Sequence, residues 1–145
     1  MKRTFIIGLM ILIALVSGSR MVFAQGTEDA VRNTLSNLFD YSKSKIYEKA
    51  ALLIAYDGED KTRNHKNALN PANKEELNQA KRKCKEIAAL IELSNKYTIS
   101  KFSTDKSDGK EVYTIEVDFI SGDQKLVKSY SFINDGKGFL LININ

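Results

Sequence analysis

The sequence predicts an α+β fold, in which three N-terminal helices pack on one face of a curved antiparallel β-meander of about four strands. Two observations support this prediction. Before residue 97 apolar side chains recur at helical spacing, and after it apolar and polar side chains alternate as in strands. Because the strands come after the helices instead of alternating with them, we expect the helices to lie on one face of the sheet.

Residues 1–24 resemble a cleaved signal peptide. Two basic residues precede an apolar stretch over residues 5–16, and residues 22–24 are small or tolerated at the positions that a signal peptidase reads. The stretch is shorter than the ~20 residues of a membrane-spanning helix, and Arg20 interrupts the residues after it. We therefore expect an exported protein, periplasmic or extracellular, with a single domain over residues 25–145 and no membrane span after cleavage. An uncleaved anchor is the alternative.

Removal of the leader nearly neutralises the chain. The full sequence has 22 Lys and Arg residues against 18 Asp and Glu residues. Three of the basic residues lie in the leader, which leaves 19 against 18, a net charge of +1. The basic residues near Lys81 have acidic neighbours on the same predicted helix, which indicates a solvated face. No nucleic-acid partner is predicted.

Two helices are predicted before residue 57. The first covers residues 28–41, with Thr27 as its N-cap. The second comes after a Ser-Lys-Ser break and covers residues 45–56. Each has an apolar stripe, as expected for a helix that covers a core. The stripes consist of Val31, Leu35, Leu38 and Phe39, and of Ile46, Ala50, Leu53 and Ile54.

Residues 57–72 form a charged segment almost without apolar side chains, which predicts a long loop. The loop contains the only histidine, His65, and an acidic cluster that starts at Asp57. A single histidine without a partner at metal-binding spacing predicts no metal site, and the acidic cluster lacks the full ligand pattern of a calcium loop. We expect His65 to be a solvated loop residue, and no cofactor is predicted.

A third helix is predicted after Asn73, which is a suitable N-cap, and Glu76 stands where a capping box places its acidic residue. The lone cysteine, Cys84, falls on the apolar side of this helix. Buried cysteine behaves as a small hydrophobic residue, so we expect Cys84 to be inert. A reactive thiol or an intermolecular disulfide is the alternative.

The C-terminal third predicts the sheet. Tyr113, Ile115, Val117 and Phe119 recur at every second residue, which places them on one face, with the polar residues between them facing water. The last strand is apolar on both faces and needs cover from helices on one side and from a partner subunit on the other. The predicted strands are 97–102, 111–120, 125–133 and 138–144.

A strongly twisted sheet with helices across its hollow side predicts a cavity between the two layers. Apolar space with a few hydroxyl groups is a common kind of ligand site. The alternative is that the same aromatic side chains fill the core. The candidate ligand-binding residues are Phe39, Tyr56, Tyr113, Phe119, Tyr130 and Phe132.

Two segments resemble the nuclear transport factor 2-like, cystatin-like α+β superfamily, particularly its small exported bacterial members. They are the helical pair with Phe39 and residues 47–51, and the terminal hairpin over residues 130–142. The resemblance implies a curved sheet, a conical pocket and frequent dimers through the sheet. The family includes isomerases and dehydratases as well as non-catalytic members. This chain places apolar residues where those enzymes place an acid or a histidine, so no catalytic residue is carried over.

The sequence leaves three functional hypotheses. The first is an exported, non-catalytic binding or accessory domain that holds a small apolar ligand. The second is a protein–protein interaction module, such as a homodimer through the sheet. The third is an isomerase- or dehydratase-like enzyme that uses Tyr41, Tyr56, Asp57 or His65. The sequence favours the first, because the predicted pocket face carries no paired titratable groups.

Overall fold

The structure is a computed structural model that describes residues 25–145, so the predicted signal peptide lies outside the described residues. The chain divides into two compact units, Met1–Ala30 and Val31–Asn145. In the first unit, the described residues 25–30 are helical. The second unit contains the sheet.

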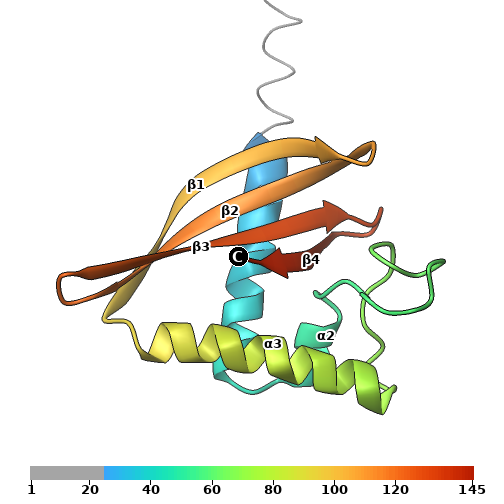
Figure 1. Ribbon diagram of the computed structural model, residues 1–145, viewed down its shortest axis with the longest axis horizontal. Helices are drawn as coiled ribbons and strands as arrows, with labels where there is room; N and C mark the ends of the chain where they lie inside the picture. The colour runs from blue at the N-terminus through green and yellow to red at the C-terminus, as the bar shows by residue number, and fades with distance from the viewer. Residues whose placement is uncertain (1–24) are drawn as a thin grey trace, which may run out of the picture. The chain divides into compact units, whose positions relative to one another are not determined.

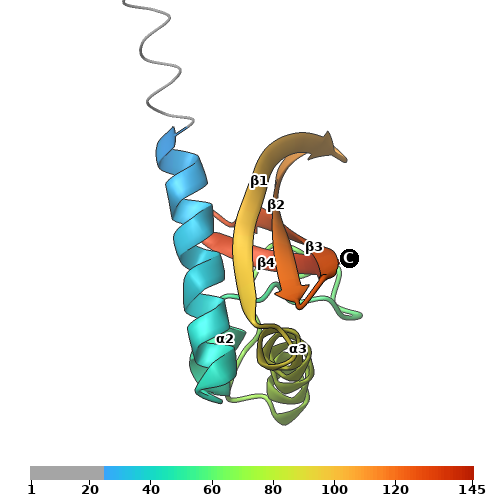
Figure 2. The ribbon, with the colours of Figure 1, turned by 90° about the vertical axis from the view of Figure 1, so that its left-hand side faces the viewer.

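The second unit is an α+β structure, as the sequence predicted. A helical segment over residues 31–43 is followed by helix α2 (Tyr47–Ala51) and helix α3 (Lys74–Glu92) (Figure 1). An antiparallel sheet of four strands comes next in the chain. Figure 2 shows the segment 31–43 alongside the sheet, whose first strand bends along its length.

The sheet is a simple meander in the order β1-β2-β3-β4, with each strand hydrogen-bonded to the next in the sequence. Asp108 and Gly109 form a two-residue turn between β1 and β2, and both have positive φ angles, 50° and 76°. Such angles match the twist of a hairpin, and glycine adopts them without steric cost. The strands are β1 (Lys96–Ser107), β2 (Lys110–Ser121), β3 (Gln124–Asn134) and β4 (Phe139–Ile144).

The predicted alternation in β2 is confirmed on its inner face. Tyr113, Ile115, Val117 and Phe119 are all buried in one core cluster. The cluster also contains apolar side chains of the segment 31–43, α2, α3, β3 and β4, so helices and sheet share a single core. Burial of these side chains stabilises the unit, because each removes apolar surface from water.

The polar residues in the middle of β2 lie on the opposite face, as predicted, and they are half-buried there. Glu116 lies 3.6 Å from the Lys101 ammonium on β1, and Asp118 lies 2.7 Å from the Lys125 ammonium on β3. The Thr114 hydroxyl is within hydrogen-bond distance, 3.2 Å, of the Ser131 hydroxyl on β3. Cross-strand neighbours therefore cover much of this face.

A second, smaller core covers the other side of β4. Leu140 packs with Ile133 of β3 and with Ala55, and Ala68 packs against this group. The backbone of the segment after α2 also joins the sheet, because Ala55 N donates to Leu141 O over 2.8 Å and Leu141 N donates to Leu53 O over 2.8 Å. Part of the cover that the two-sided final strand requires thus comes from the same chain.

The helix boundaries differ from the predicted ones at two places. Thr27 is not an N-cap, because residues 25 and 26 before it are already helical. The second helix does not reach residue 56; α2 ends at Ala51 because Ile54 pairs with Leu141 of β4. A tertiary backbone contact here overrides the local helical pattern.

Helix α3 begins as predicted, with Asn73 as N-cap: its side-chain oxygen accepts from Glu75 N over 2.9 Å and from Glu76 N over 3.1 Å. The predicted capping box is wrong, because the Glu76 carboxylate binds Arg63 and Asn70 N instead of returning to the cap. Cys84 is fully buried in the core, and burial raises the pKa of its thiol. Both features fit an inert cysteine.

Candidate functional site

The six predicted ligand-binding aromatic residues lie in different surroundings. Phe39 is the centre of one group, with its ring centroid 5.4 Å from that of Tyr130 and 6.2 Å from that of Phe119. Tyr113 belongs to a second group, 5.2 Å from the Phe139 ring. Phe132 is fully buried in the same core, whereas Tyr56 lies at its edge. Five of the six are thus packed in the core, where aromatic contacts at such distances are typical.

An open groove borders this core between the C-terminal end of α3 and the β2–β3 hairpin. We call it the apolar groove; its volume is about 440 Å³. Leu93 is 77% exposed and Leu126 is 48% exposed, which is unusual for such large apolar side chains in one place. The lining residues are Leu90, Leu93, Ser94, Phe119, Ser121, Gln124, Lys125 and Leu126.

The apolar groove carries little free charge. Its one basic residue, Lys125, is paired with Asp118 over 2.7 Å, and no carboxylate is among the lining residues. The Ser94 hydroxyl donates to Leu90 O over 2.6 Å, which satisfies it within the helix terminus. The groove therefore favours neutral, apolar groups.

The charged segment after α2 is held in place by an ion pair with α3. Arg63 donates from Nη1 and Nη2 to the two carboxylate oxygens of Glu76, each over 2.9 Å, and its guanidinium lies 4.2 Å from the Tyr56 ring centre. Glu76 also accepts from Asn70 N over 2.7 Å. The hydrogen bonds from Arg63, aided by the one from Asn70, lower the pKa of the buried Glu76.

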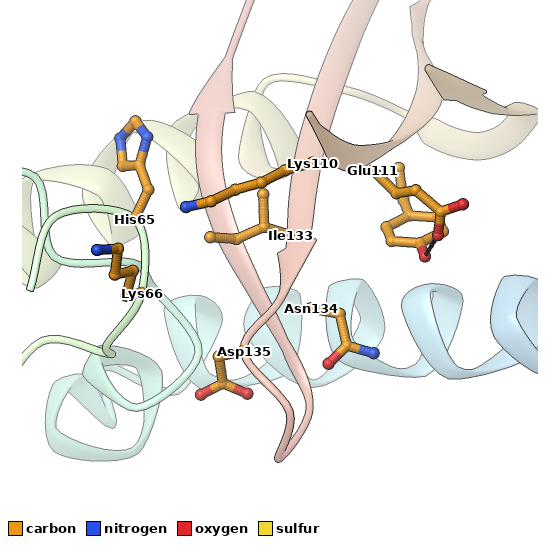
Figure 3. A pocket seen from close by; sticks show the side chains of 8 residues that line it. His65, Lys66, Lys110, Glu111, Ile133, Asn134 and Asp135 are labelled. Atoms are coloured by element: carbon orange, nitrogen blue, oxygen red, sulfur yellow. Dashed lines mark hydrogen bonds between the residues drawn. The ribbon is translucent and has the colours of Figure 1, made fainter. Parts of the chain in front are cut away.

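This segment forms one wall of a second pocket at an end of the sheet, which we call the sheet-end pocket (Figure 3). Its volume is about 530 Å³. In Figure 3 the Lys110 side chain extends from β2 toward the segment that carries His65 and Lys66, with Ile133 between the two sides. The lining residues are His65, Lys66, Lys110, Glu111, Tyr113, Ile133, Asn134 and Asp135.

The acids of the sheet-end pocket already accept hydrogen bonds. Glu111 accepts from the Tyr113 hydroxyl over 2.6 Å, a bond that contributes most to raising the pKa of Tyr113 to about 12. Asp135 Oδ1 accepts from Lys137 N and Gly138 N, each over 2.8 Å. Among the residues that the structure describes, neither Lys66 nor Lys110 forms an ion pair.

The residues named for an enzymatic function do not share one of these pockets. His65 Nε2 lies 3.7 Å from Asp57 Oδ1, too far for a hydrogen bond, and both side chains are substantially exposed. His65 lines the sheet-end pocket, whereas Tyr56 lines a separate one with Glu59 and Glu76. Tyr41 lies half-buried at the edge of the main core.

Within residues 25–145, no three His, Cys, Asp or Glu side chains are grouped so that they could hold a metal ion. In the same part of the chain, none of the helices has the length and apolar character needed to cross a membrane.

Phe119 and Tyr113 were predicted from the sequence as ligand-binding residues, and His65 was named for the enzymatic alternative, whereas the other residues of both pockets were missed. The one sequence feature that pointed to the apolar groove was the pair of apolar residues Leu126 and Val127 next to a hairpin turn. Both were interpreted as ordinary strand residues, so no groove was predicted there. The sheet-end pocket combines residues of the charged segment with those of β2 and β3, and only the folded chain brings them together.

Comparison with known proteins gives no relative for this chain. No protein-family model matches it, and neither a curated protein nor a solved structure matches it significantly.

Proposed function

We propose that this protein is a non-catalytic binding domain that holds a small, neutral, apolar ligand in the apolar groove. The observation that supports this most directly is the exposure of Leu93 and Leu126 on either side of a concave surface. Large exposed apolar side chains that gather in one concave region are typical of binding sites. The groove volume, about 440 Å³, is within the range of small-molecule pockets.

The position of the groove modifies the predicted cavity. The cavity was predicted to lie between helices and sheet, and the groove lies between α3 and the β2–β3 hairpin, with Phe119 as a lining residue in both cases. A ligand in the groove would contact Phe119, which belongs to the aromatic cluster of Phe39, Phe119 and Tyr130. The pairing of Lys125 with Asp118 favours a neutral ligand over an anionic one.

A neutral fluorescent probe, N-phenyl-1-naphthylamine, tests this proposal. We expect its fluorescence to rise on addition of the protein, and Leu93→Ser with Leu126→Ser to weaken binding at least about tenfold, because each leucine loses apolar contact. Leu52→Ser is the matched control, since Leu52 is 54% exposed but lies outside the groove. Equal affinity of all three proteins would contradict the proposal.

Native mass spectrometry of the protein purified from its source complements this test. It reports a retained small molecule and the oligomeric state together. A retained neutral lipid-like or aromatic molecule supports the proposal. N-terminal sequencing of the same sample tests export, which predicts a mature chain that begins at Gln25.

Self-association through the outer face of the sheet is a second candidate function. Two pairs of opposite charge, Lys101 with Glu116 and Lys125 with Asp118, lie on this face. A second copy related by a twofold axis would therefore meet a surface on which both signs of charge are present. Light scattering over a concentration series tests it: a dimer is expected, and a monomer at every concentration would rule it out.

We also infer membership of the nuclear transport factor 2-like, cystatin-like superfamily. The order of helices before an antiparallel meander supports this inference, and so does the β3–β4 hairpin, whose loop at residues 135–138 matches the acidic-glycine turn of the resemblance. The inference also fits a non-catalytic member, because the inner face of β2 carries apolar residues and tyrosine.

A further inference from the structure

We propose that the sheet-end pocket is a second binding site, which takes a small organic anion with one phosphate or carboxylate group attached to an apolar part. The pocket is separate from the apolar groove: the two share no lining residue. The proposal therefore does not depend on the function proposed above.

The lysines of the pocket are unpaired among the described residues, whereas its acids already accept hydrogen bonds. Its two acids are engaged, Glu111 by the Tyr113 hydroxyl at 2.6 Å and Asp135 by two backbone N–H groups at 2.8 Å. Lys66 and Lys110 form no ion pair within the described residues, so their ammonium groups remain available. Ammonium groups form strong, charge-assisted hydrogen bonds with phosphate and carboxylate oxygens.

The two lysines come from different walls of the pocket. Lys66 lies on the charged segment after α2, and Lys110 begins β2; Figure 3 shows the Lys110 side chain directed toward that segment. The segment is a fixed wall, because Arg63 binds Glu76 of α3 through two hydrogen bonds of 2.9 Å. Neither lysine has to be drawn from an existing ion pair to bind.

Ile133 and Tyr113 explain why the anion should carry an apolar part. Ile133 lies between the two walls and is 4% exposed, and Tyr113, which is also buried, lines the pocket too. A ring or short alkyl group of the ligand would lie against the small exposed part of these side chains while its anionic group meets a lysine. The volume of about 530 Å³ accommodates a molecule of this size.

His65 gives the segment a further feature that fits a polar ligand. Its backbone has a positive φ of 51°, an uncommon conformation for a residue with a side chain, and its N–H donates to Tyr56 O over 3.0 Å. Within this partly exposed side chain, the Nε2 atom itself is buried and has no hydrogen-bond partner among the described residues. The Asp57 carboxylate, at 3.7 Å, is beyond hydrogen-bond distance. Unpaired buried polar atoms are rare, and a bound ligand or water commonly completes them.

Phenyl phosphate, benzoate and the neutral benzyl alcohol are suitable probes, followed by NMR of the backbone amides. We expect phenyl phosphate or benzoate to shift amides at residues 65–66, 110–111 and 133–135, and benzyl alcohol to bind at least about tenfold more weakly. Whichever of phenyl phosphate and benzoate binds more tightly identifies the preferred anionic group as phosphate or carboxylate. Inorganic phosphate alone reports how much of the affinity the anionic group provides.

Replacement of both lysines tests the assignment. Lys66→Ala with Lys110→Ala should weaken anion binding at least about tenfold while thermal unfolding stays unchanged, because both side chains are exposed. The control is Lys74→Ala with Lys85→Ala, which removes the same charge from exposed positions of α3. Shifts that are absent, that persist in the Lys66/Lys110 variant, or that occur equally with benzyl alcohol would overturn the proposal.

Discussion

The Tyr130 hydroxyl is an unusual group in this core, because it is buried and has no hydrogen-bond partner among the described residues. Burial raises the pKa of Tyr130, since the charged form is excluded from the apolar interior. An unpaired buried hydroxyl opposes folding, as it loses its hydrogen bonds to water. We predict that Tyr130→Phe raises the free energy of unfolding by about 1 kcal/mol, measured by chemical denaturation.

Tyr113 provides the matched comparison. Its hydroxyl donates to Glu111 over 2.6 Å, so Tyr113→Phe removes a hydrogen bond that exists. This variant should lower the free energy of unfolding by about 1 kcal/mol, in the opposite direction to Tyr130→Phe. Destabilisation by both variants would show that the Tyr130 hydroxyl has a partner in solution.

Glu76 should make the free energy of unfolding depend on pH in the acidic range. Its hydrogen bonds with Arg63 and Asn70 N lower its folded pKa below the ordinary value of 4.5. The stabilisation is therefore present above pH 4.5 and is lost as pH falls through the folded pKa. We predict that Glu76→Gln costs about 1–2 kcal/mol at pH ~7 and that the two proteins converge in strongly acidic solution.

Glu75→Gln is the control for this prediction. Glu75 is exposed and forms no ion pair among the described residues, so its replacement should change the free energy of unfolding at neutral pH much less than Glu76→Gln does. A difference between wild type and Glu76→Gln that stays constant from neutral to acidic pH would show that the carboxylate does not titrate with folding.

At the scale of the element, α3 depends on its N-cap. The Asn73 side chain accepts hydrogen bonds from Glu75 N and Glu76 N, which have no partner within the helix. We predict that Asn73→Ala lowers the free energy of unfolding by about 1 kcal/mol, whereas Asn73→Asp keeps most of the stabilisation that the cap provides. The melting temperature of the three proteins measures this; equal values would mean that the cap contributes nothing.

The elements also show what local pattern can predict. Alternation in β2 was sufficient to place Tyr113 and Phe119 on the buried face, because a period of two leaves no other arrangement. The end of α2 could not be predicted, since Ile54 pairs with Leu141, far along the chain. The capping box failed for the same reason: Glu76 matched the pattern, but Arg63 and Asn70 bind its carboxylate in the fold.

For the molecule as a whole, the shared core predicts cooperative unfolding of residues 31–145. Phe39 is 1% exposed and contacts the rings of Phe119 and Tyr130 from two strands. We predict that Phe39→Ala costs about 3–5 kcal/mol and that helix and sheet signals are lost in one transition. Far-ultraviolet and near-ultraviolet circular dichroism measure secondary structure and aromatic packing; separate midpoints would contradict a single core.

The candidate sites were harder to predict from the sequence than the fold. The aromatic residues predicted as ligand-binding mark the core, because aromatic side chains are apolar wherever they stand. The residues that form the sheet-end pocket, such as Lys66 and Lys110, are ordinary surface lysines until the charged segment meets β2. The order of that segment depends on Arg63, which no local motif distinguishes from other basic residues.

The fully buried Cys84 makes the thiol a reporter of folding. Alkylating reagents reach the sulfur only in molecules that open the interface between α3 and the rest of the core, so the labelling rate counts such openings. In an oxidising compartment, a covalently linked pair of chains would then mark molecules that lost their native structure, and folded copies would stay unlinked.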